Sequence, residues 1–229
     1  MDTTTDPLTH VRALMARATG DEKHDESTTS TLDALWVLYD RILRIDPAHP
    51  DAEDRDRFIL SKGHGPASLY AILAAKGFFP PEWLDAFLDH DGRLGSHPDR
   101  TQVPGIEAST GSLGHGLPMA MGVAQALRAK GRMDTRVVVL TGDAELNEGS
   151  NWEGVMLAPN LRLGNLTWLI VDNHSSSWPM GPWDAWLPPF GWDVRVVDGH
   201  DHDALAAALG VRHPEQPVAV VADIPEGEW

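Results

Sequence analysis

Two oxygen-bearing side chains follow two apolar runs in the middle of the chain. Asp143 comes directly after the β-branched run 137–142, and Asn173 comes just after the run 167–171. Continuous apolar runs with a helical segment between them predict buried parallel strands, whose carboxyl ends meet where α/β proteins bind ligands. A carboxylate and an amide oxygen at this edge suit Mg²⁺ or Ca²⁺ and, through the metal, a phosphate. The ordinary alternative is that Asp143 is a helix N-cap and Asn173 a turn residue.

The rest of the chain alternates strand-like and helix-like segments around these two runs. The expected strands are the run ending at residue 60 and residues 137–142, 167–171, 193–197 and 218–222. The expected helices are residues 8–18, 32–43, 67–76, 80–88, 117–130, a segment that Pro159 stops at Ala158, and 203–209. This order predicts an α/β fold, with a doubly wound, mostly parallel sheet and helices on both faces. We expect a single domain over residues 1–229.

The composition limits the partners and the chemistry. With 18 Lys and Arg against 34 Asp and Glu, the formal net charge of −16 argues against nucleic acid or an anionic membrane as a partner. A metal ion can still supply the positive charge that one phosphorylated cofactor needs. There is no cysteine, which excludes disulfides, thiolate nucleophiles and cysteine-ligated zinc. The N-terminus does not resemble a signal peptide and no apolar stretch is long enough to span a bilayer, so we expect a cytoplasmic protein.

Two glycine-rich loops precede helices and could approach a ligand closely. In residues 61–66 two glycines flank His64, and in residues 104–116 several glycines precede a helix of small residues. Glycine lets the backbone lie close to a ligand, and a helix N-terminus favours an anion. The alternative for the first loop is a strand-to-helix turn that needs flexible residues. The second loop has neither the Walker nor the Rossmann spacing, so it is weak evidence by itself.

Three ordered motifs give the chain a family resemblance. Residues 56–65 read DRFILSKGHG, residues 104–116 read PGIEASTGSLGHG, and the pair Gly142-Asp143 is followed about thirty residues later by Asn173. The last of these is similar to the thiamine diphosphate signature. In order and spacing, the three motifs resemble the N-terminal, diphosphate-binding half of transketolase, as found in two-subunit transketolases. The resemblance implies a thiamine diphosphate-binding fold, with thiamine diphosphate and Mg²⁺ as cofactors.

The resemblance also implies a role for each site residue. The metal ligands would be the Asp143 carboxylate, the Asn173 amide oxygen and the backbone carbonyl of Ser175. The cofactor contacts would be His64, Gly111, Ser112, Leu113, Gly142, Asp143, Ala144 and Asn173. The catalytic positions would be His24, His64, His97, Glu148 and Glu153, where the histidines move protons and the glutamates couple paired sites near a subunit interface. The cofactor would carry the carbon–carbon bond chemistry on a ketose.

Some of these positions have ordinary alternatives. His24 lies in a polar stretch, residues 19–30, where a solvated surface histidine is expected. Glu148 and Glu153 are also the kind of acidic residue that favours the first turns of a helix.

The chain departs from the family pattern at several places. Ala144 replaces the last glycine of Gly-Asp-Gly, which the fold tolerates if the φ angle there is negative. A polar run, residues 174–178, follows Asn173 in place of a more apolar one. The chain ends at Trp229 without the basic-glycine segment that closes the family's domain, so one diphosphate contact is expected to be absent or supplied elsewhere.

The resemblance implies a partner subunit. The family activates thiamine diphosphate with a glutamate from a separate pyrimidine-binding domain, and we expect no room for that domain in 229 residues. We therefore expect an α₂β₂ assembly with a partner chain that carries it, acting on a sugar or ketose-like substrate. An interface could use the tryptophans of the C-terminal third, or these could pack the domain's own edge; they are Trp178, Trp183, Trp186 and Trp192.

Three functions are compatible with the sequence. The first is a subunit of a heteromeric transketolase-like enzyme that transfers a two-carbon ketol unit. The second is a catalytically degenerate homologue that acts as a binding or scaffold subunit, which Ala144 favours and the retained Asp143 and Asn173 oppose. The third is another thiamine diphosphate-dependent enzyme that makes or breaks carbon–carbon bonds, such as a relative of 1-deoxyxylulose-phosphate synthase. Residues 61–64 and 110–114 fit transketolase better than this third function.

Overall fold

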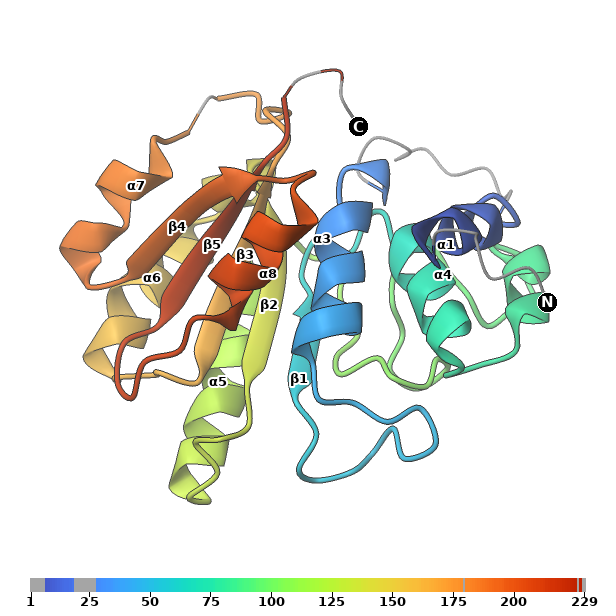
Figure 1. Ribbon diagram of the computed structural model, residues 1–229, viewed down its shortest axis with the longest axis horizontal. Coiled ribbons are helices and arrows are strands. Elements are labelled where there is room, and N and C mark those ends of the chain that lie inside the picture. The colour runs from blue at the N-terminus through green and yellow to red at the C-terminus, as the bar shows by residue number, and fades with distance from the viewer. Residues whose placement is uncertain (1–6, 19–27, 179, 226, 228–229) are drawn as a thin grey trace.

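Five parallel strands form the sheet on which the chain is built (Figure 1). The computed structural model describes residues 7–18, 28–178, 180–225 and 227. The strands are β1 (Arg57–Leu60), β2 (Val137–Gly142), β3 (Leu166–Asp172), β4 (Asp193–Asp198) and β5 (Val218–Asp223). Their order across the sheet is β1-β2-β3-β5-β4, and every neighbouring pair runs parallel. The predicted parallel α/β sheet is therefore confirmed.

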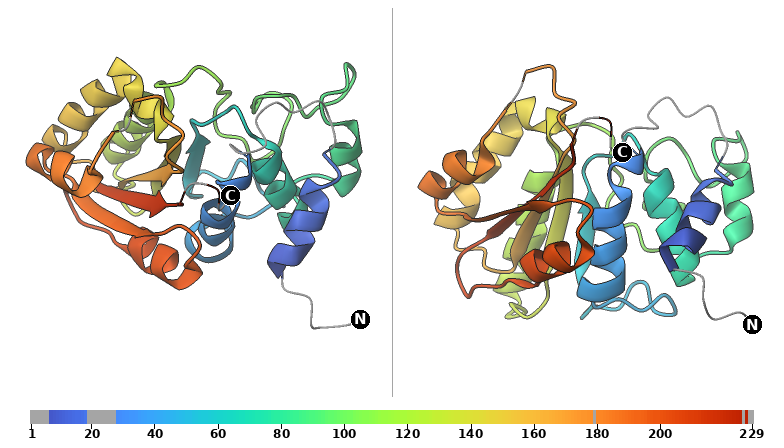
Figure 2. Two further views of the ribbon diagram at one scale, coloured as in Figure 1. Left: turned by 90° about the horizontal axis from the view of Figure 1, so that it is seen from above. Right: turned by 45° about the horizontal axis from the view of Figure 1, so that its top comes forward.

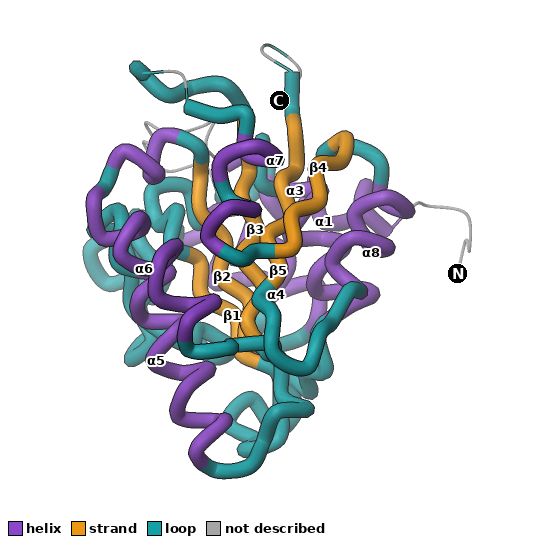
Figure 3. The backbone as a smooth tube through the Cα atoms, turned by 90° about the vertical axis from the view of Figure 1, so that its left-hand side faces the viewer, coloured by secondary structure: helices purple, strands orange, loops and turns teal. Residues whose placement is uncertain are grey.

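Helices connect the strands and cover the sheet. The α-helices are α1 (Pro7–Met15), α3 (Leu32–Val37), α4 (Ala67–Lys76), α5 (Gly116–Ala129), α6 (Gly149–Asn160), α7 (Trp183–Trp186) and α8 (His202–Gly210). The shorter helical segments are the π-helical η1 (Leu38–Ile42) and the 3₁₀ turns η2 (Pro81–Ala86), η3 (Ala144–Asn147) and η4 (Pro188–Phe190). Seen from the side, the strands lie between α5 and α6 on one face and α3 and α8 on the other (Figure 3).

Alternating residues of the central strands feed two separate cores. In β2, Val138 and Leu140 belong to the core under α3, α4 and α8, whereas Val137 and Val139 belong to the core under α5 and α6. Both sets are fully buried. A strand that is apolar on both faces needs a layer of helices on each side, and this explains the doubly wound arrangement that the continuous apolar runs predict (Figure 2).

The second helix is less regular than its sequence predicts. A single helix was expected over residues 32–43, but α3 ends at Val37 and continues as the π-helical η1. The wider turn is closed by the backbone N–H of Leu43, which donates to the Leu38 carbonyl at 2.9 Å. Both Leu38 and Tyr39 are buried in this turn. An i→i+5 turn changes the direction of the following side chains, which spacing alone does not reveal.

Pro159 does not stop α6 where the sequence predicts. The helix runs to Asn160, with Pro159 inside its last turn. Proline lacks the N–H that would bond the carbonyl four residues earlier, which here belongs to Val155. The indole N–H of Trp192 donates to that carbonyl instead, at 2.9 Å. The helix was expected to end at about Ala158 and runs two residues further, and a distant side chain supplies the donor that the proline lacks.

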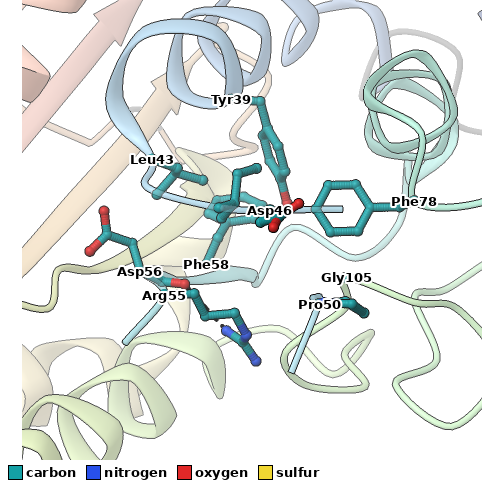
Figure 4. A pocket seen from close by; sticks show the side chains of 10 residues that line it. Tyr39, Leu43, Asp46, Pro50, Arg55, Asp56, Phe58, Phe78 and Gly105 are labelled. Carbon is teal, nitrogen blue, oxygen red and sulfur yellow. Dashed lines mark hydrogen bonds between the residues drawn. The ribbon is translucent and has the colours of Figure 1, made fainter. Parts of the chain in front are cut away.

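No helix in the described ranges has both the length and the apolar character needed to cross a lipid bilayer. One narrow pocket lies near the amino end of β1 and is lined by, among others, Tyr39, Phe58 and Phe78 (Figure 4). Its volume of about 20 Å³ holds little more than one water molecule. Its walls are mostly apolar, and burial raises the pKa of Tyr39. This pocket lies away from the carboxyl edge of the sheet, where ligands are expected to bind.

Candidate active site

Three chain segments leave the carboxyl edge of the sheet next to one another. Residues 61–66 follow β1, Asp143 follows β2, and Asn173 follows β3. These are adjacent strands of the sheet. The glycine-rich loop before α5 joins them, because the Thr110 hydroxyl donates to the Leu60 carbonyl at 2.6 Å. The three sequence motifs are therefore brought to one place by the fold.

The side chains of Asp143 and Asn173 converge on one hydroxyl. The Ser175 hydroxyl donates to Asn173 Oδ1 at 2.8 Å and to Asp143 Oδ1 at 3.3 Å. The other Asp143 oxygen accepts the backbone N–H of Ser176 at 3.0 Å. Asp143 and Asn173 are 3% and 2% exposed. Both oxygens lie within hydrogen-bond distance of the same hydroxyl, so the residues expected to bind metal lie together.

This set of oxygen atoms suits a hard divalent cation. Mg²⁺ takes six oxygen ligands and usually obtains several of them from water or phosphate rather than from the protein. In the part of the chain that the structure describes, no three His, Cys, Asp or Glu side chains are grouped for a metal. The chain therefore offers one carboxylate and neutral oxygens, a set that leaves room for phosphate. The alternative role of Asp143 as an N-cap is not supported, because its side chain makes no capping hydrogen bond to η3.

Lys62 brings a positive charge to this edge, a role that the sequence alone did not suggest. Its side chain is 8% exposed, and Nζ donates to the Ser30 hydroxyl at 3.0 Å. The lysine stem lies over Gly142, where an added Cβ would be 3.2 Å from Lys62 Cδ. Burial lowers the pKa of Lys62 to about 8, while the charges of Asp143 and Glu145 act in the opposite direction. A buried ammonium facing a carboxylate and an open edge is suited to bind an anion.

The two glycine-rich loops touch each other through their backbones. A Cβ added to Gly63 would lie 2.8 Å from the backbone nitrogen of Gly111. Gly111 has a φ angle of +142°, and a Cβ there would lie 2.6 Å from Cδ2 of His97. Beyond it, Ser112 is exposed and Leu113 is half-buried. The segment Gly111 to Leu113, expected to contact the cofactor, is thus open to solvent beside a predicted catalytic histidine.

Two of the three predicted histidines meet at the site. The His64 and His97 rings pack edge to face, with centroids 4.7 Å apart and planes at 83°. His97 is exposed, and its Nδ1 lies 3.1 Å from the Ser96 hydroxyl. His24 lies outside the described residues, so its catalytic role stays a prediction.

Comparison with known proteins decides the family. The family described as "Transketolase, thiamine diphosphate binding domain" matches residues 7–220. This chain belongs to the transketolase family. The matched range includes all three motifs and every predicted site residue.

This transketolase domain matches most of the length of three related proteins, each of which is longer than this chain. The protein named Ferredoxin fas2 of Rhodococcoides fascians is 51% identical over 214 residues, which cover 93% of this chain and 70% of that protein. An apulose-4-phosphate transketolase subunit of Actinobacillus succinogenes is 36% identical over 214 residues, covering 89% of this chain and 76% of that one. The 6-deoxy-6-sulfo-D-fructose transketolase subunit SqwG of a Clostridium species is 37% identical over 193 residues, covering 81% and 70%.

Solved transketolases share the fold of this domain. Transketolase from Leishmania mexicana superposes with a TM-score of 0.81 at 27% identity over 94% of this chain and 36% of that one. A transketolase variant from Pichia stipitis gives the same TM-score and identity over 95% of this chain and 35% of its own. The chain therefore spans about a third of these solved transketolases.

The two predicted interface glutamates of the transketolase domain lie at the start of α6. Glu148 is the residue before the helix, Glu153 is in its second turn, and both are exposed. Glu148 makes no side-chain capping hydrogen bond, but both residues lie at the amino end of α6, so the alternative that they favour the first turns of the helix stays open. Glu148 also packs on the glycine-rich loop, since a Cβ added to Gly114 would be 2.5 Å from Glu148 Cβ. Their role in coupling paired sites stays a prediction.

The four tryptophans of the C-terminal third divide into two pairs. Trp178 and Trp186 are 74% and 40% exposed, whereas Trp183 and Trp192 are 4% and 2% exposed. The indole N–H of Trp183 donates to Asp172 at 2.6 Å. The interface interpretation is therefore wrong for Trp183 and Trp192, which pack the edge of the domain itself. It stays open for Trp178 and Trp186.

The backbone tolerates alanine in place of the last glycine of Gly-Asp-Gly. Ala144 begins the 3₁₀ turn η3, and it is not among the described non-glycine residues that have a positive φ angle. The condition for tolerating the methyl group is met, because a Cβ costs nothing at a negative φ. In the polar run that follows Asn173, by contrast, His174 does adopt a φ angle of +56°. Its ring is held by Asp223, 2.9 Å from Nε2.

Proposed function

We propose that this chain is the diphosphate-binding subunit of a two-subunit, thiamine diphosphate- and Mg²⁺-dependent transketolase-like enzyme that transfers a two-carbon ketol unit. The observation that carries the proposal is the convergence of the buried Asp143 and Asn173 oxygens on one hydroxyl, with the Lys62 ammonium at the same edge. These groups supply what a metal-bound diphosphate needs: hard oxygen ligands, and a cation for the remaining phosphate charge.

Each group has a place in this proposal. Asp143, Asn173 and Ser175 hold Mg²⁺, Lys62 and His64 contact the diphosphate, and the open segment 111–113 lies along the rings of the cofactor, with Gly142 and Ala144 beside its phosphates. When bound, thiamine diphosphate supplies the nucleophilic carbon and the electron sink that carbon–carbon bond transfer requires. Lys62 matters most here because the chain is strongly acidic, with a net charge of −16.

Three histidines, His24, His64 and His97, move protons at the substrate. Imidazole both donates and accepts protons near neutral pH. Because the Ser96 hydroxyl lies 3.1 Å from Nδ1 of His97, the other ring nitrogen is the one that exchanges a proton with a substrate hydroxyl. His64 contributes from the cofactor side, 4.7 Å away between ring centroids. His24 is proposed as a third proton-handling residue on the substrate side.

A separate subunit completes the enzyme in this proposal. Two relatives that this chain resembles over most of its length are named as transketolase subunits, one for apulose 4-phosphate and one for 6-deoxy-6-sulfo-D-fructose. We infer a partner that carries the pyrimidine-binding domain and its activating glutamate, in an α₂β₂ assembly at which Glu148 and Glu153 couple the paired sites. The substrate class is a ketose or a related sugar derivative, and the location is the cytoplasm.

The name of one relative points to different chemistry. Ferredoxin fas2 is 51% identical to this chain, but the 229-residue sequence contains no cysteine, the usual ligand of an iron–sulfur cluster. The metal ligands that the chain does offer are oxygen atoms, which suit Mg²⁺.

Calorimetric titration with thiamine diphosphate tests the proposal, with and without Mg²⁺ and with and without the partner subunit. We expect binding that needs Mg²⁺ and tightens when the partner is present, and transfer of a ketol unit from a ketose to an aldose only in the complete assembly. No binding under any condition would leave the alternative of a degenerate scaffold subunit. Turnover of a 2-keto acid in place of a ketose would support a different enzyme of the thiamine diphosphate class.

A further inference from the structure

Glu145 is a buried carboxylate that the proposed chemistry does not use. It lies in η3, two residues after Asp143, and is 1% exposed. Its Oε1 atom accepts two hydrogen bonds, a short one from the Ser61 hydroxyl and one of 2.8 Å from the backbone N–H of Gly114. Ser61 follows β1, and Gly114 belongs to the glycine-rich loop before α5. One oxygen atom therefore connects residues from each of the three sequence motifs.

The Ser61 hydroxyl extends this connection by one more bond. While it donates to Glu145, its oxygen accepts the backbone N–H of Gly116 at 2.9 Å. Gly114 lies two residues before α5, and Gly116 is the first residue of that helix. Two amides at the end of the glycine-rich loop are thus fixed by one carboxylate and one hydroxyl.

The end of the glycine-rich loop packs closely on its neighbours. Gly114 has a φ angle of +82°, and a Cβ there would lie 2.5 Å from Glu148 Cβ. A Cβ on Gly116 would lie 2.2 Å from the Ser61 side chain. Glycine has no side chain that could hold it in place. Hydrogen bonds to the backbone therefore set the position of these two residues. The Ser150 hydroxyl holds the Gly114 carbonyl in the same way, at 2.7 Å.

Glu145 itself is fixed from the other side. Asn151 donates to its backbone carbonyl at 2.7 Å, and the Trp152 indole donates to the carbonyl of Leu146 at 2.8 Å. Its second carboxylate oxygen, Oε2, is buried without a hydrogen bond of ordinary geometry. Burial raises the pKa of the Glu145 carboxyl, and its hydrogen-bond donors and the charge of Lys62 act in the opposite direction. A buried oxygen left unsatisfied costs stability. The carboxylate is therefore better explained by the two loops it holds than by its contribution to folding.

We propose that Glu145 is a positioning residue of this site: through Oε1 it holds the Ser61 hydroxyl and the Gly114 amide, and so fixes the first two motif loops against the third. The inference rests on the proposed function only in that these loops are the ones proposed to surround thiamine diphosphate. The role requires a hydrogen-bond acceptor at Oε1 and does not require that the group be charged.

Hydrogen exchange of the full chain tests the contact without any cofactor. In Glu145→Ala we expect the Gly114 amide to exchange roughly tenfold faster or more than in the wild type, because its buried acceptor is gone. Glu145→Gln keeps an acceptor oxygen, and exchange should stay within about threefold of the wild type. Ser61→Ala removes the acceptor of the Gly116 amide but not that of Gly114, so it should release mainly Gly116. This smaller change also provides the test if Glu145→Ala does not fold.

Titration of thiamine diphosphate with Mg²⁺ into the assembly of this chain and its partner gives the functional readout. We expect Glu145→Ala to raise the dissociation constant and the apparent KM for the cofactor by roughly tenfold, with kcat at saturating cofactor nearly unchanged, and Glu145→Gln to restore both. Glu215→Gln, on an exposed surface glutamate, is the matched control and should behave as the wild type.

Two results would overturn the inference. Gly114 exchange in Glu145→Ala equal to that of the wild type would show that the carboxylate does not hold the loop. Equal damage from Gln and Ala would show that the charge matters and not the acceptor. If the wild type fails to bind thiamine diphosphate, the proposed function fails, while the exchange data still decide whether Glu145 positions the loops.

Discussion

The backbone of Gly111 lies directly against the imidazole of His97. A Cβ atom at Gly111 would be only 2.6 Å from Cδ2 of that ring, and the φ angle of +142° is one that residues with side chains rarely adopt. The His97 ring also meets His64, with 4.7 Å between the ring centroids. The glycine thus sets where one predicted catalytic histidine stands relative to the other.

Gly111→Ala should therefore damage both stability and turnover. Backbone strain of about 1–3 kcal/mol is expected from the φ angle, and the methyl group must also displace the His97 ring. Gly122→Ala is the matched control, since a Cβ at that position in α5 meets nothing within 4 Å and should add up to about 1 kcal/mol of stability. Thermal unfolding and kcat/KM for ketol transfer measure the two effects. A wild-type kcat/KM in Gly111→Ala would mean that turnover does not depend on where the His97 ring lies against residue 111.

Asp143→Asn should abolish metal-dependent cofactor binding while leaving the fold intact. An asparagine oxygen can still accept a hydrogen bond from the Ser175 hydroxyl or the Ser176 amide, so the melting temperature without metal should change little. The only carboxylate of the ligand set is lost, and the affinity for Mg²⁺ with thiamine diphosphate should fall by more than about 100-fold, because even outer partners of a metal are worth 10–100-fold. Calorimetry measures the affinity, with the exposed Asp184→Asn as control. Retained Mg²⁺ dependence would place the metal elsewhere.

Lys62 should give the chain a distinctive pH dependence. Its pKa of about 8 lies below the usual lysine value of 10.5 because burial disfavours the charged form. Between these two values the unfolded chain binds more protons than the folded one, so this residue makes stability rise with pH across that window. The full effect is of the order of 3 kcal/mol. Urea unfolding of the wild type and of Lys62→Met at pH 7.5 and pH 10 should show that the difference between them changes in this direction.

Loss of the Lys62 proton at high pH should also weaken anion binding. Above pH 8 the neutral amine of Lys62 no longer attracts a diphosphate, so the affinity should fall with rising pH in the wild type and stay flatter in Lys62→Met. Lys76→Met, which removes a partly exposed lysine paired with Asp40 at 2.6 Å, is the control and should follow the wild type. Parallel pH curves for the wild type and Lys62→Met would contradict the assignment.

Ala144→Gly, which restores the last glycine of Gly-Asp-Gly, should bring no gain. Because Ala144 already has a negative φ angle in η3, the glycine only adds conformational freedom to the unfolded chain and should cost about 0.5–1 kcal/mol in unfolding free energy. The dissociation constant of thiamine diphosphate should stay within about threefold of the wild-type value. Binding tightened tenfold or more would mean that the methyl group crowds the phosphates, and would favour the degenerate-homologue alternative.

Much of the fold could be predicted because its signals are local. The β2 and β3 runs are apolar at nearly every position and stop at Asp143 and Asn173, so both the parallel sheet and its functional edge follow from sequence. The exceptions depend on tertiary contacts. The π-helical turn at Leu38 and the extension of α6 past Pro159 each rest on hydrogen bonds that spacing does not reveal.

The site shows the same division. The metal-ligand pair, the glycine loop and His64 were predicted because they lie in recognisable motifs, and His97 was predicted from the family resemblance. The contact between His64 and His97 is a finding of the structure. Lys62 lies inside one of those motifs, yet sequence does not show that its ammonium is buried beside Asp143. Glu145 was missed because its two partners are 84 and 31 residues away along the chain. A charged residue close to a motif glycine is the signal that could have drawn attention to both.

The contact between Trp192 and the proline-containing turn of α6 can be tested by a double-mutant cycle. Trp192→Phe removes the donor to the Val155 carbonyl, which is buried, and should cost about 1–3 kcal/mol in unfolding free energy from the unsatisfied carbonyl, beyond the loss of ring volume. Pro159→Ala supplies a backbone N–H four residues after Val155, which can donate to the same carbonyl. The double variant should therefore recover about 0.5–1.5 kcal/mol relative to the sum of the single changes, measured by urea unfolding. Strict additivity would mean that the two donors do not share this acceptor, and that α6 tolerates Pro159 for another reason.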